Sequence, residues 1–331
     1  MTTTTSSYIE SLQAHVAQEL RTPVSPEIEW LAHEIAAIYG ETVLGVMFYG
    51  SSLRADSADG VFDFWVVVDD YRDAYAKNWL ARINQIIPPN VFYIEREHQG
   101  QTLRSKYGVI SRQAFETGTS FAAWHPYVWA RFAQPARTVA CRDEAAQQVL
   151  VAAVANAILT MIGRLVCILP ERDDEFRFSL AAFWQEAFRR IYDSERRPQS
   201  DEIISALYSV DQERYNAVAS FALQQLASDG HFAKAAPQAR SFRVAMSKSG
   251  RRQSRLRWRV MRSFARSLRL IRLAKTAITI QDWVPYVLWK IERHTGRRIE
   301  LSERQQRHPW IFAWPIILPL LFRRNLRSFE E

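Results

Sequence analysis

Two apolar runs joined by a Gly-Ser turn and a polar loop constrain the fold of this chain most. Residues 43–49, VLGVMFY, and 62–68, FDFWVVV, are short, apolar and rich in β-branched and aromatic residues, a composition typical of buried strands. Gly50 follows the first run, and Asp63 lies near the start of the second. We expect two core strands with a tight turn at Gly50 and a carboxylate at the entry to the second strand.

The neighbouring segments predict an α+β unit that reaches to about residue 140. Helical periodicity and helix-end residues predict helices at 26–39 and 72–87. Residues 90–97 and 102–110 are apolar, β-prone runs on either side of the turn HQGQ, which predicts two more strands. A mixed sheet flanked by helices is the fold class that this order favours.

The pattern becomes helical after residue 140. Residues 142–169 are long, Ala-rich and apolar, but the polar Asn156, Thr160 and Arg164 favour a buried bundle helix over a membrane span. Further helices are expected at 173–193, 199–207 and 210–228, with few or no strands. The predicted units are a catalytic unit (1–140), a mostly α-helical domain (141–245) and a basic amphipathic C-terminal region (246–331).

The positive charge is concentrated in one segment. The chain has a net charge of +8, but residues 251–275 hold nine Arg and one Lys without an acidic residue. The rest of the chain has 33 Lys and Arg against 35 Asp and Glu, a net charge of −2. This distribution indicates one docking patch for a polyanion rather than a surface wrapped by nucleic acid.

Helical spacing within this segment predicts an amphipathic helix. Leu256, Val260, Phe264, Leu268 and Ile271 form one apolar stripe at intervals of three or four residues. Such helices lie in the plane of a membrane surface, and we expect these flanking arginines to face anionic headgroups: Arg252, Arg255, Arg259, Arg262, Arg266 and Arg269. Packing of the stripe on the protein core and binding of nucleic acid are the alternatives, and nucleic acid is not expected.

An apolar segment near the end of the chain, residues 309–322, is too short and too proline-rich for a spanning helix. Trp310 and Trp314 suit a membrane interface. We expect a monotopic anchor or acyl-chain guide, with packing on the helical domain or on a second subunit as the alternative. A homodimer therefore stays open.

The turn at residue 50 has the elements that nucleotidyl transfer requires. Gly50 allows close approach of phosphates to the backbone, the Ser51 hydroxyl would add a hydrogen bond, and Asp63 would hold Mg²⁺. Many such enzymes carry a second carboxylate two residues on, where this chain has Trp65. Asp69 points to the same side but lies about 20 Å along the strand. A plain turn beside a solvated strand end is the alternative.

A second stretch completes a family pattern. The segments YGSS (49–52), FDFWVVVDD (62–70) and KYGVIS (106–111), with Trp124, Tyr127, Arg131 and Pro135, resemble the mitochondrial-type phosphatidate cytidylyltransferases, the soluble CDP-diacylglycerol synthases. RQS at 252–254 also matches. The resemblance is strongest over residues 43–140 and does not cover the last fifty residues. Members of this family also carry an apolar residue at the position of Trp65.

The resemblance implies a polymerase-β-like nucleotidyltransferase fold and the reaction of CTP with phosphatidic acid to CDP-diacylglycerol and pyrophosphate, with Mg²⁺. Carried over by position, Tyr49, Gly50, Ser51 and Ser52 would form the nucleotide-binding turn and Asp63 would hold the metal. Lys106 and Arg131 would bind the triphosphate or the lipid phosphate, in an order that stays open. Glu95, outside the family pattern, is a further candidate metal ligand.

The expected partners are CTP, phosphatidic acid and an anionic membrane surface. The first residues, MTTTTSSYIESLQ, lack the features of a signal peptide, and the preference for Arg over Lys is typical of a GC-rich bacterial genome. We therefore expect a cytoplasmic protein, peripheral on the inner face of a bacterial membrane. A nucleotidyltransferase with another acceptor (lipid phosphate, sugar phosphate, RNA or protein) and a catalytically silent membrane scaffold of the same fold are the alternatives.

Overall fold

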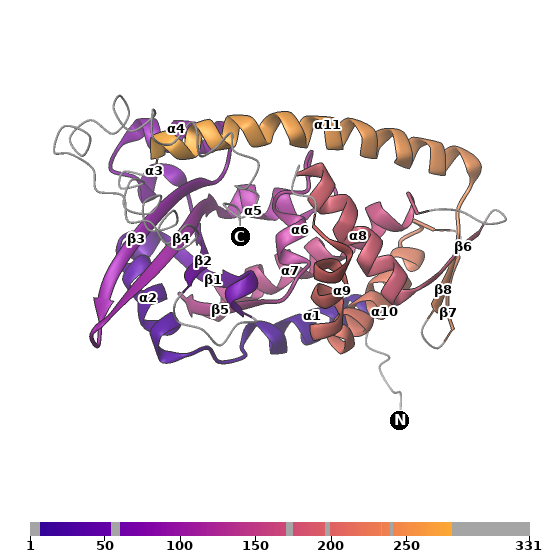
Figure 1. Cartoon of the computed structure of the whole chain (residues 1–331), viewed down its shortest axis with the longest axis horizontal. Helices are drawn as coiled ribbons and strands as arrows, with labels where there is room; N and C mark the ends of the chain where they lie inside the picture. Colours follow the sequence, from indigo (N-terminus) through magenta and orange to yellow (C-terminus); the bar gives the residue numbers. More distant parts are fainter. Residues whose placement is uncertain are drawn as a thin grey trace.

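A five-stranded mixed sheet forms the centre of the N-terminal half (Figure 1). The computed structural model describes residues 7–53, 60–169, 175–195, 199–232, 234–238 and 241–279. The strand order is β3-β4-β2-β1-β5, with β2 and β4 parallel and the other neighbours antiparallel. The strands are β1 (Val43–Tyr49), β2 (Val61–Val68), β3 (Asn90–His98), β4 (Gln101–Ser111) and β5 (Ala136–Cys141). The predicted α+β class and the four predicted strands are confirmed.

One row of paired residues crosses the sheet where Asp63 lies. Tyr49 on β1 is opposite Asp63 on β2, Asp63 is opposite Lys106 on β4, and Lys106 is opposite Tyr93 on β3. Residues directly opposite one another project to the same face of a sheet. The register therefore brings Tyr49, Asp63 and Lys106 together from three strands.

The two faces of this sheet have separate cores. Phe48, Phe64 and Val66 point to the face that α2 (Pro26–Ala37) covers. Helix α2 was predicted to continue to residue 39, but it ends at Ala37, before Gly40 adopts a φ of 58° and opens a short 3-10 turn, Gly40–Thr42. The opposite face carries Asp63 and packs on the helices that follow the sheet.

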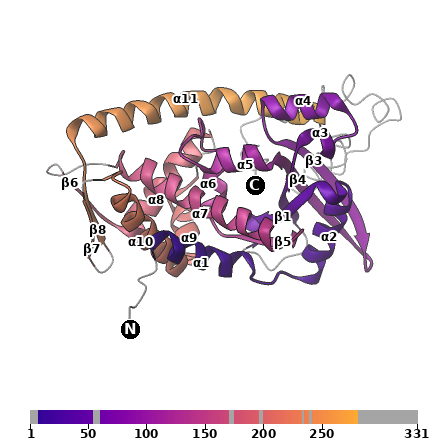
Figure 2. The same ribbon diagram turned by 180° about the vertical axis from the view of Figure 1, so that it is seen from behind.

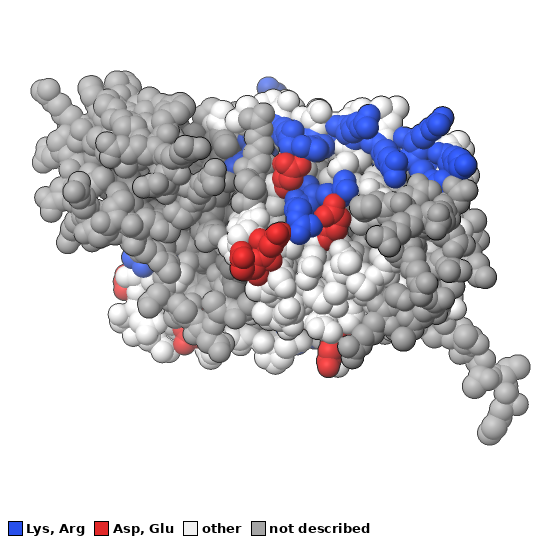
Figure 3. Space-filling model, turned by 45° about the vertical axis from the view of Figure 1, so that its right-hand side comes forward, with Lys and Arg blue, Asp and Glu red and all other residues white. Residues whose placement is uncertain are grey.

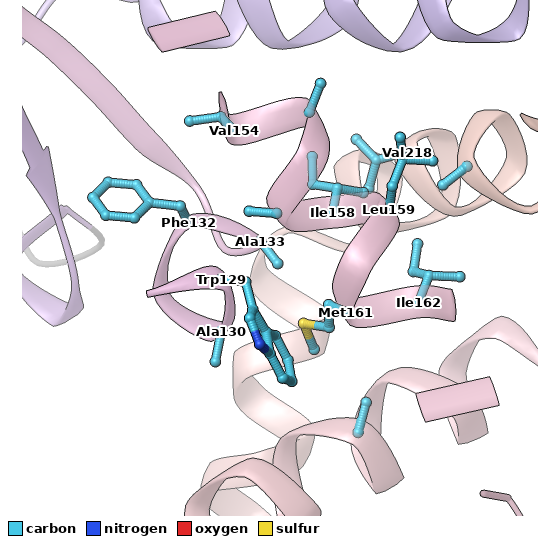
Figure 4. Packing of buried hydrophobic residues seen from close by; sticks show 14 of the residues in the cluster. Trp129, Ala130, Phe132, Ala133, Val154, Ile158, Leu159, Met161, Ile162 and Val218 are labelled. Atoms are coloured by element: carbon cyan, nitrogen blue, oxygen red, sulfur yellow. The ribbon is translucent and has the colours of Figure 1, made fainter. Parts of the chain in front are cut away.

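Those helices surround the long helix α7 (Glu144–Val166). In Figure 4, Trp129 of α6 (Trp129–Phe132) lies beside Met161 of α7, and both belong to the same buried core. Within the described residues, α7 is the one helix long and apolar enough to cross a membrane, but most of its surface is buried in this core. Its composition therefore reflects burial by α1 (Tyr8–Leu20), α5 (Arg112–Thr119), α6 and α10 (Gln212–Ser228).

The region after α7 contains a sheet as well as helices, which corrects one prediction. The helix expected at 173–193 begins at Leu180, as α8 (Leu180–Ser194), and β6 (Glu175–Ser179) precedes it. Strand β6 pairs with β8 (Ser241–Ala245), which also pairs with β7 (Lys234–Gln238). The partners lie far apart in the sequence, so no local pattern revealed this sheet. Helix α9 (Asp201–Val210) completes the region.

The helix predicted at 72–87 is two shorter helices. Helix α3 (Tyr71–Ala74) ends where Tyr75 takes an extended conformation, and α4 (Asn78–Ile86) follows. Asp70 caps α3, with its Oδ1 accepting from the backbone N–H of Arg72 at 2.8 Å.

A long basic helix, α11 (Lys248–Thr279), runs across one side of the molecule from the small sheet to the vicinity of α4 (Figures 1 and 2). Its inner face is formed by Trp258, Met261, Ala265 and Leu268, all buried. The predicted apolar stripe is therefore wrong at Leu268, which faces the core. Leu256, Val260, Phe264 and Ile271 are exposed and form the outer stripe.

Candidate functional site

The centre of the candidate site is an ion pair between neighbouring strands. Lys106 Nζ lies 3.2 Å from Asp63 Oδ1, because the parallel register of β2 and β4 sets the two residues side by side. Both side chains are partly exposed, at 23% for Asp63 and 39% for Lys106. A carboxylate and an ammonium group are thus presented together at an accessible position on the sheet.

Gly50 forms the wall of this site beside Asp63. It follows β1 with a φ of 95°, a conformation that favours glycine. A Cβ atom at this position would lie 3.5 Å from Asp63 Oδ2, so a side chain here would extend over the carboxylate. The lack of a side chain keeps the carboxylate open to a ligand.

A 3-10 turn, Ser51–Leu53, continues from Gly50 and returns the chain toward β2. The Leu53 N–H donates to the Gly50 carbonyl at 3.3 Å, and Ser52 Oγ donates to the Val61 carbonyl at 3.1 Å. These bonds connect the turn to the start of β2, two residues before Asp63. The predicted role of the Ser51 hydroxyl lies outside what the structure describes.

Tyr49 lies among the charged groups of the site. Burial raises the pKa of the Tyr49 phenol to about 12, and the Asp63 carboxylate adds to this shift, while the charges of Arg131 and Lys106 oppose it. The phenol is therefore neutral at physiological pH and can donate or accept a hydrogen bond. Tyr49 therefore interacts electrostatically with Asp63 and Lys106 on the sheet and with Arg131, which comes from the helices beside it.

Trp65 fills the core beneath the site. Its ring is buried and packs against Tyr49, Tyr127 and Phe132, with centroid distances of 6.4, 5.9 and 5.3 Å. Because Trp65 projects to the same face as Asp63, it occupies the space that a second carboxylate would need. The tryptophan supports the ring of Tyr127 instead.

Arg131 approaches from α6 and is held by Glu195, at the end of α8. Arg131 Nη1 donates to Glu195 Oε1 at 3.0 Å and to the Tyr127 carbonyl at 2.6 Å. Its guanidinium carbon lies 3.8 Å from the centroid of the Tyr127 ring. Burial opposes the charge of Arg131, but Glu195 and the nearby tyrosines outweigh it and raise its pKa.

The structure adds Arg272 of α11, which the sequence had placed only within a basic run. Its guanidinium carbon lies 4.0 Å from the Tyr127 centroid, and its Nη2 lies 3.0 Å from His125 Nε2. Burial and the charge of Arg272 lower the pKa of His125 to about 3, so His125 is neutral and Nε2 accepts from Arg272. Arg272 lies on the inner face, four residues after Leu268, a spacing that a helical wheel reveals.

Other predicted acids lie apart from Asp63. Glu95 is on β3, two strands from Asp63, and accepts from Arg104 Nε at 3.2 Å and from the Tyr93 hydroxyl at 2.5 Å. The sheet spacing separates the Cα atoms of Glu95 and Asp63 by about 12 Å. Asp69 pairs with Arg142. The structure therefore does not bring Glu95 or Asp69 together with Asp63.

The fit of Mg²⁺ to the site depends on this single carboxylate. Among the described residues, no group of three or more His, Cys, Asp or Glu side chains could hold a metal ion. Mg²⁺ is commonly held by one or two carboxylates together with substrate phosphates and water. Asp63 beside the open Gly50 turn fits that arrangement, with the phosphates supplied by the nucleotide.

The arginines of α11 predicted to face a membrane divide into an exposed group and a group that contacts α8. Figure 3 shows Lys and Arg side chains gathered along α11, with Asp and Glu side chains below them. Arg252, Arg255 and Arg259 are exposed. Arg262 and Arg266 instead pair with Asp193, each at 3.0 Å, and Arg269 donates to the Glu195 carbonyl. Half of the predicted arginines therefore also attach α11 to the end of α8.

Trp310 and Trp314 lie outside the described residues.

Comparison of the chain with models of known protein families and with curated proteins finds no match.

Proposed function

We propose that this chain is a Mg²⁺-dependent cytidylyltransferase that converts CTP and phosphatidic acid to CDP-diacylglycerol and pyrophosphate at a membrane surface. The observation that carries the proposal is the cluster of Gly50, Asp63 and Lys106, formed by neighbouring strands of a mixed sheet. The sequence resemblance over residues 43–140 supplies the nucleotide and the acceptor.

Each residue of the cluster has a role in this reaction. The turn at residues 50–53 receives the CTP phosphates, and Lys106 offsets their negative charge. Asp63 and the nucleotide phosphates hold Mg²⁺, which neutralises charge on the phosphates when it is bound. These roles need the open space beside Asp63 that the glycine provides.

The ionisation state of the acceptor removes the need for a general base. The second pKa of a phosphate monoester is near 6, so phosphatidic acid is largely a dianion at neutral pH. Its oxygen forms the bond to the α-phosphorus of CTP, while the bond from that phosphorus to the bridging oxygen breaks and pyrophosphate leaves with the electron pair. No proton has to be removed from the nucleophile, so the site needs no general base.

The outer surface of α11 supports action at a membrane. Leu256, Val260, Phe264 and Ile271 are each about half exposed or more, and they follow one another at helical spacing. The inner face already packs on the protein, so the outer stripe is not needed for the core. With Arg252, Arg255 and Arg259 beside it, this surface suits an anionic leaflet.

Purified protein incubated with CTP, Mg²⁺ and vesicles that contain phosphatidic acid tests the reaction. We expect CDP-diacylglycerol and pyrophosphate in equal amounts, and a loss of at least about 100-fold in rate for Asp63→Asn. Glu95→Gln serves as the matched carboxylate control and should retain activity. Absence of product from the wild type, or full activity of Asp63→Asn, would falsify the assignment.

Parallel reactions distinguish the alternatives. Pyrophosphate release with a sugar phosphate or an RNA end, but not with phosphatidic acid, would identify another acceptor. No Mg²⁺-dependent binding of any nucleotide by calorimetry would favour a silent scaffold.

Membrane contact is tested separately with two exposed apolar residues. Phe264→Ser, in the outer stripe, should weaken sedimentation with anionic vesicles several-fold without lowering the melting temperature. Val210→Ser, at the end of α9, is the matched control and should bind vesicles as the wild type does. Equal binding by both variants would show that the outer stripe does not contact lipid.

A further inference from the structure

Two buried cations on α11 have no ion-pair partner among the described residues. Arg272 and Lys275 have exposed fractions of 8% and 6%. Arg272 Nε and Nη2 donate to the Pro88 carbonyl at 3.2 and 3.1 Å, and Lys275 Nζ donates to the Ile87 carbonyl. Within the part of the chain that the structure describes, no carboxylate lies within ion-pair distance of either group.

A buried positive charge without an ionised partner is costly, because solvation is lost and no opposite charge replaces it. Burial lowers the pKa of Arg272 to about 10 and that of Lys275 to about 7, and each shift reflects this cost. Groups with strongly shifted pKa values cluster at functional sites, so we consider an anionic ligand here. The ligand then provides the charge that the protein lacks.

Arg272 shares the ring of Tyr127 with Arg131. The two guanidinium carbons lie 4.0 and 3.8 Å from the same ring centroid, so the groups must occupy opposite faces of the ring. This stack sets the separation of the two cations. Tyr127 also packs on Trp65, two residues from Asp63 on the same face of β2, which places the stack beside the Asp63 cluster.

The charged groups around Tyr127 carry more positive than negative charge, and a dianion would balance them. Asp63 pairs with Lys106, and Glu195 pairs with Arg131 and also attracts Arg272 from a greater distance, whereas no described acid lies within ion-pair distance of Arg272 or Lys275. Arg272 also lies next to Ile271, which is exposed in the outer stripe. Ile271 therefore faces the expected membrane side, and Arg272, the next residue of α11, faces the interior of the site.

We propose that Arg272 binds the phosphate of the acceptor, the phosphomonoester of a glycerophospholipid, with Lys275 contributing to its charge. This inference rests on the proposed function and assigns the cation that faces the second substrate. The nucleotide phosphates then belong to the Gly50 turn and Lys106, on the β1–β2 side of Tyr127. Helix α11 is thereby part of the site as well as the membrane-facing element.

The test compares Arg272→Gln with the wild type in steady-state kinetics, using dihexanoyl phosphatidic acid, a water-soluble acceptor that removes the membrane from the measurement. We expect KM for this acceptor to rise at least tenfold, KM for CTP to change less than twofold, and Arg272→Lys to be intermediate, because lysine keeps the positive charge but lacks the planar set of donors of the guanidinium group. Arg21→Gln neutralises an exposed arginine that pairs with Glu144 and should leave both constants unchanged.

Direct binding separates this inference from the proposed function. Calorimetry without CTP should detect dihexanoyl phosphatidic acid but not dihexanoyl glycerol, and Arg272→Gln should abolish the signal. Phosphate-dependent binding without any CDP-diacylglycerol product would contradict the proposed reaction but support Arg272 as a phosphate-binding residue. Inorganic phosphate in place of the lipid shows whether the phosphate group is sufficient for recognition.

Two results would overturn the inference. One is unchanged acceptor affinity in Arg272→Gln, and the other is an equal loss of CTP and acceptor affinity with a lowered melting temperature, which would indicate a purely structural role. If Arg272→Gln does not fold, Arg272→Lys decides, because its ammonium group can still donate to the Pro88 carbonyl. Wild-type acceptor affinity in Arg272→Lys would then overturn the assignment of phosphate binding to the guanidinium group.

Discussion

Arg214 and Arg272 are both buried arginines that join a C-terminal helix to the N-terminal half, but their surroundings differ. Arg214, on α10, donates from Nε to Glu19 Oε2 at 2.7 Å and from Nη1 to the Ala133 carbonyl at 2.6 Å. Arg272, on α11, donates twice to one carbonyl, that of Pro88, and contacts a neutral histidine and an aromatic ring. Arg214 forms an ion pair, whereas Arg272 has no acid at ion-pair distance within the described residues.

The pKa values of the two arginines shift in opposite directions. Burial opposes the charge of Arg214, but the Glu19 carboxylate and Tyr215 outweigh it and raise its pKa. Burial dominates at Arg272 and lowers its pKa to about 10. A paired buried cation indicates a structural contact, whereas one without a described acid indicates a place for a ligand. The following changes test that contrast.

The largest effect is expected from Glu19→Gln, which leaves Arg214 buried without its carboxylate. Breaking one partner of a buried pair costs about 3–5 kcal/mol in the free energy of unfolding. Urea denaturation measures this loss. Glu144→Gln, which breaks the exposed pair with Arg21, is the control and should cost less than about 1 kcal/mol. Similar costs for the two variants would show that burial does not distinguish these pairs.

A ligand effect should appear at Arg272 and not at Arg214. Dihexanoyl phosphatidic acid at about 100 times its dissociation constant should stabilise the wild type by about 2.7 kcal/mol, because it binds the folded state. Thermal unfolding with and without the lipid measures the shift. Arg272→Met should not respond, whereas Glu19→Gln should respond from its lower baseline. An undiminished response in Arg272→Met would contradict the assignment of the ligand to α11.

Lys275 should make stability depend on pH. Burial lowers its pKa to about 7 in the folded state from 10.5, and the charge of Arg272 adds to the shift. Between these values the unfolded chain binds more protons, so stability should rise as pH increases from about 7 to 10.5, and its loss on lowering the pH should be complete once pH has fallen through about 7. The slope is at most about 1.4 kcal/mol per pH unit.

Lys275→Met should remove this slope between pH 7 and 9, as measured by urea denaturation at several pH values. Lys77→Met, which removes an exposed lysine before α4, should leave the slope unchanged. A wild-type slope in Lys275→Met would show that another group titrates in this range.

The smallest effect is expected on the stability of the free protein when Arg272 is removed. Arg272→Met loses its bonds to the Pro88 carbonyl but also removes a buried charge without a described acid, and these effects offset one another. We expect a change of less than about 1 kcal/mol in the free energy of unfolding. A loss as large as that of Glu19→Gln would indicate that Arg272 is structural, as Arg214 is.

Short-range sequence patterns predicted the main sheet well. The apolar runs at 43–49 and 62–68 became adjacent strands, and the turn at Gly50 lies beside Asp63 as expected. The helix predicted at 173–193 was wrong over its first residues, because β6 exists through pairing with β8, far along the chain. A pattern that depends on a distant partner has no local signature.

In the long basic segment, residues 251–275, the local pattern again does not reveal which side chains pack on the rest of the protein. Its periodicity predicted a helix with an apolar stripe, but α11 has apolar residues on two sides, and Leu268 belongs to the inner one. By sequence alone the arginines of residues 251–275 form a single basic group. Packing divides them into exposed residues such as Arg259, residues tied to α8 such as Arg266, and the buried Arg272.

The sequence by itself determined the elements of the candidate site that lie close together along the chain: the Gly50 turn, the strand with Asp63, and the basic composition of residues 251–275. Periodicity, turn residues and charge are local properties, so they can be recognised without a fold. Tertiary structure decided that Lys106 pairs with Asp63, that Trp65 supports Tyr127, and that Arg272 meets Arg131 across one ring. These contacts join residues far apart in the chain, and only strand register and helix packing bring them together.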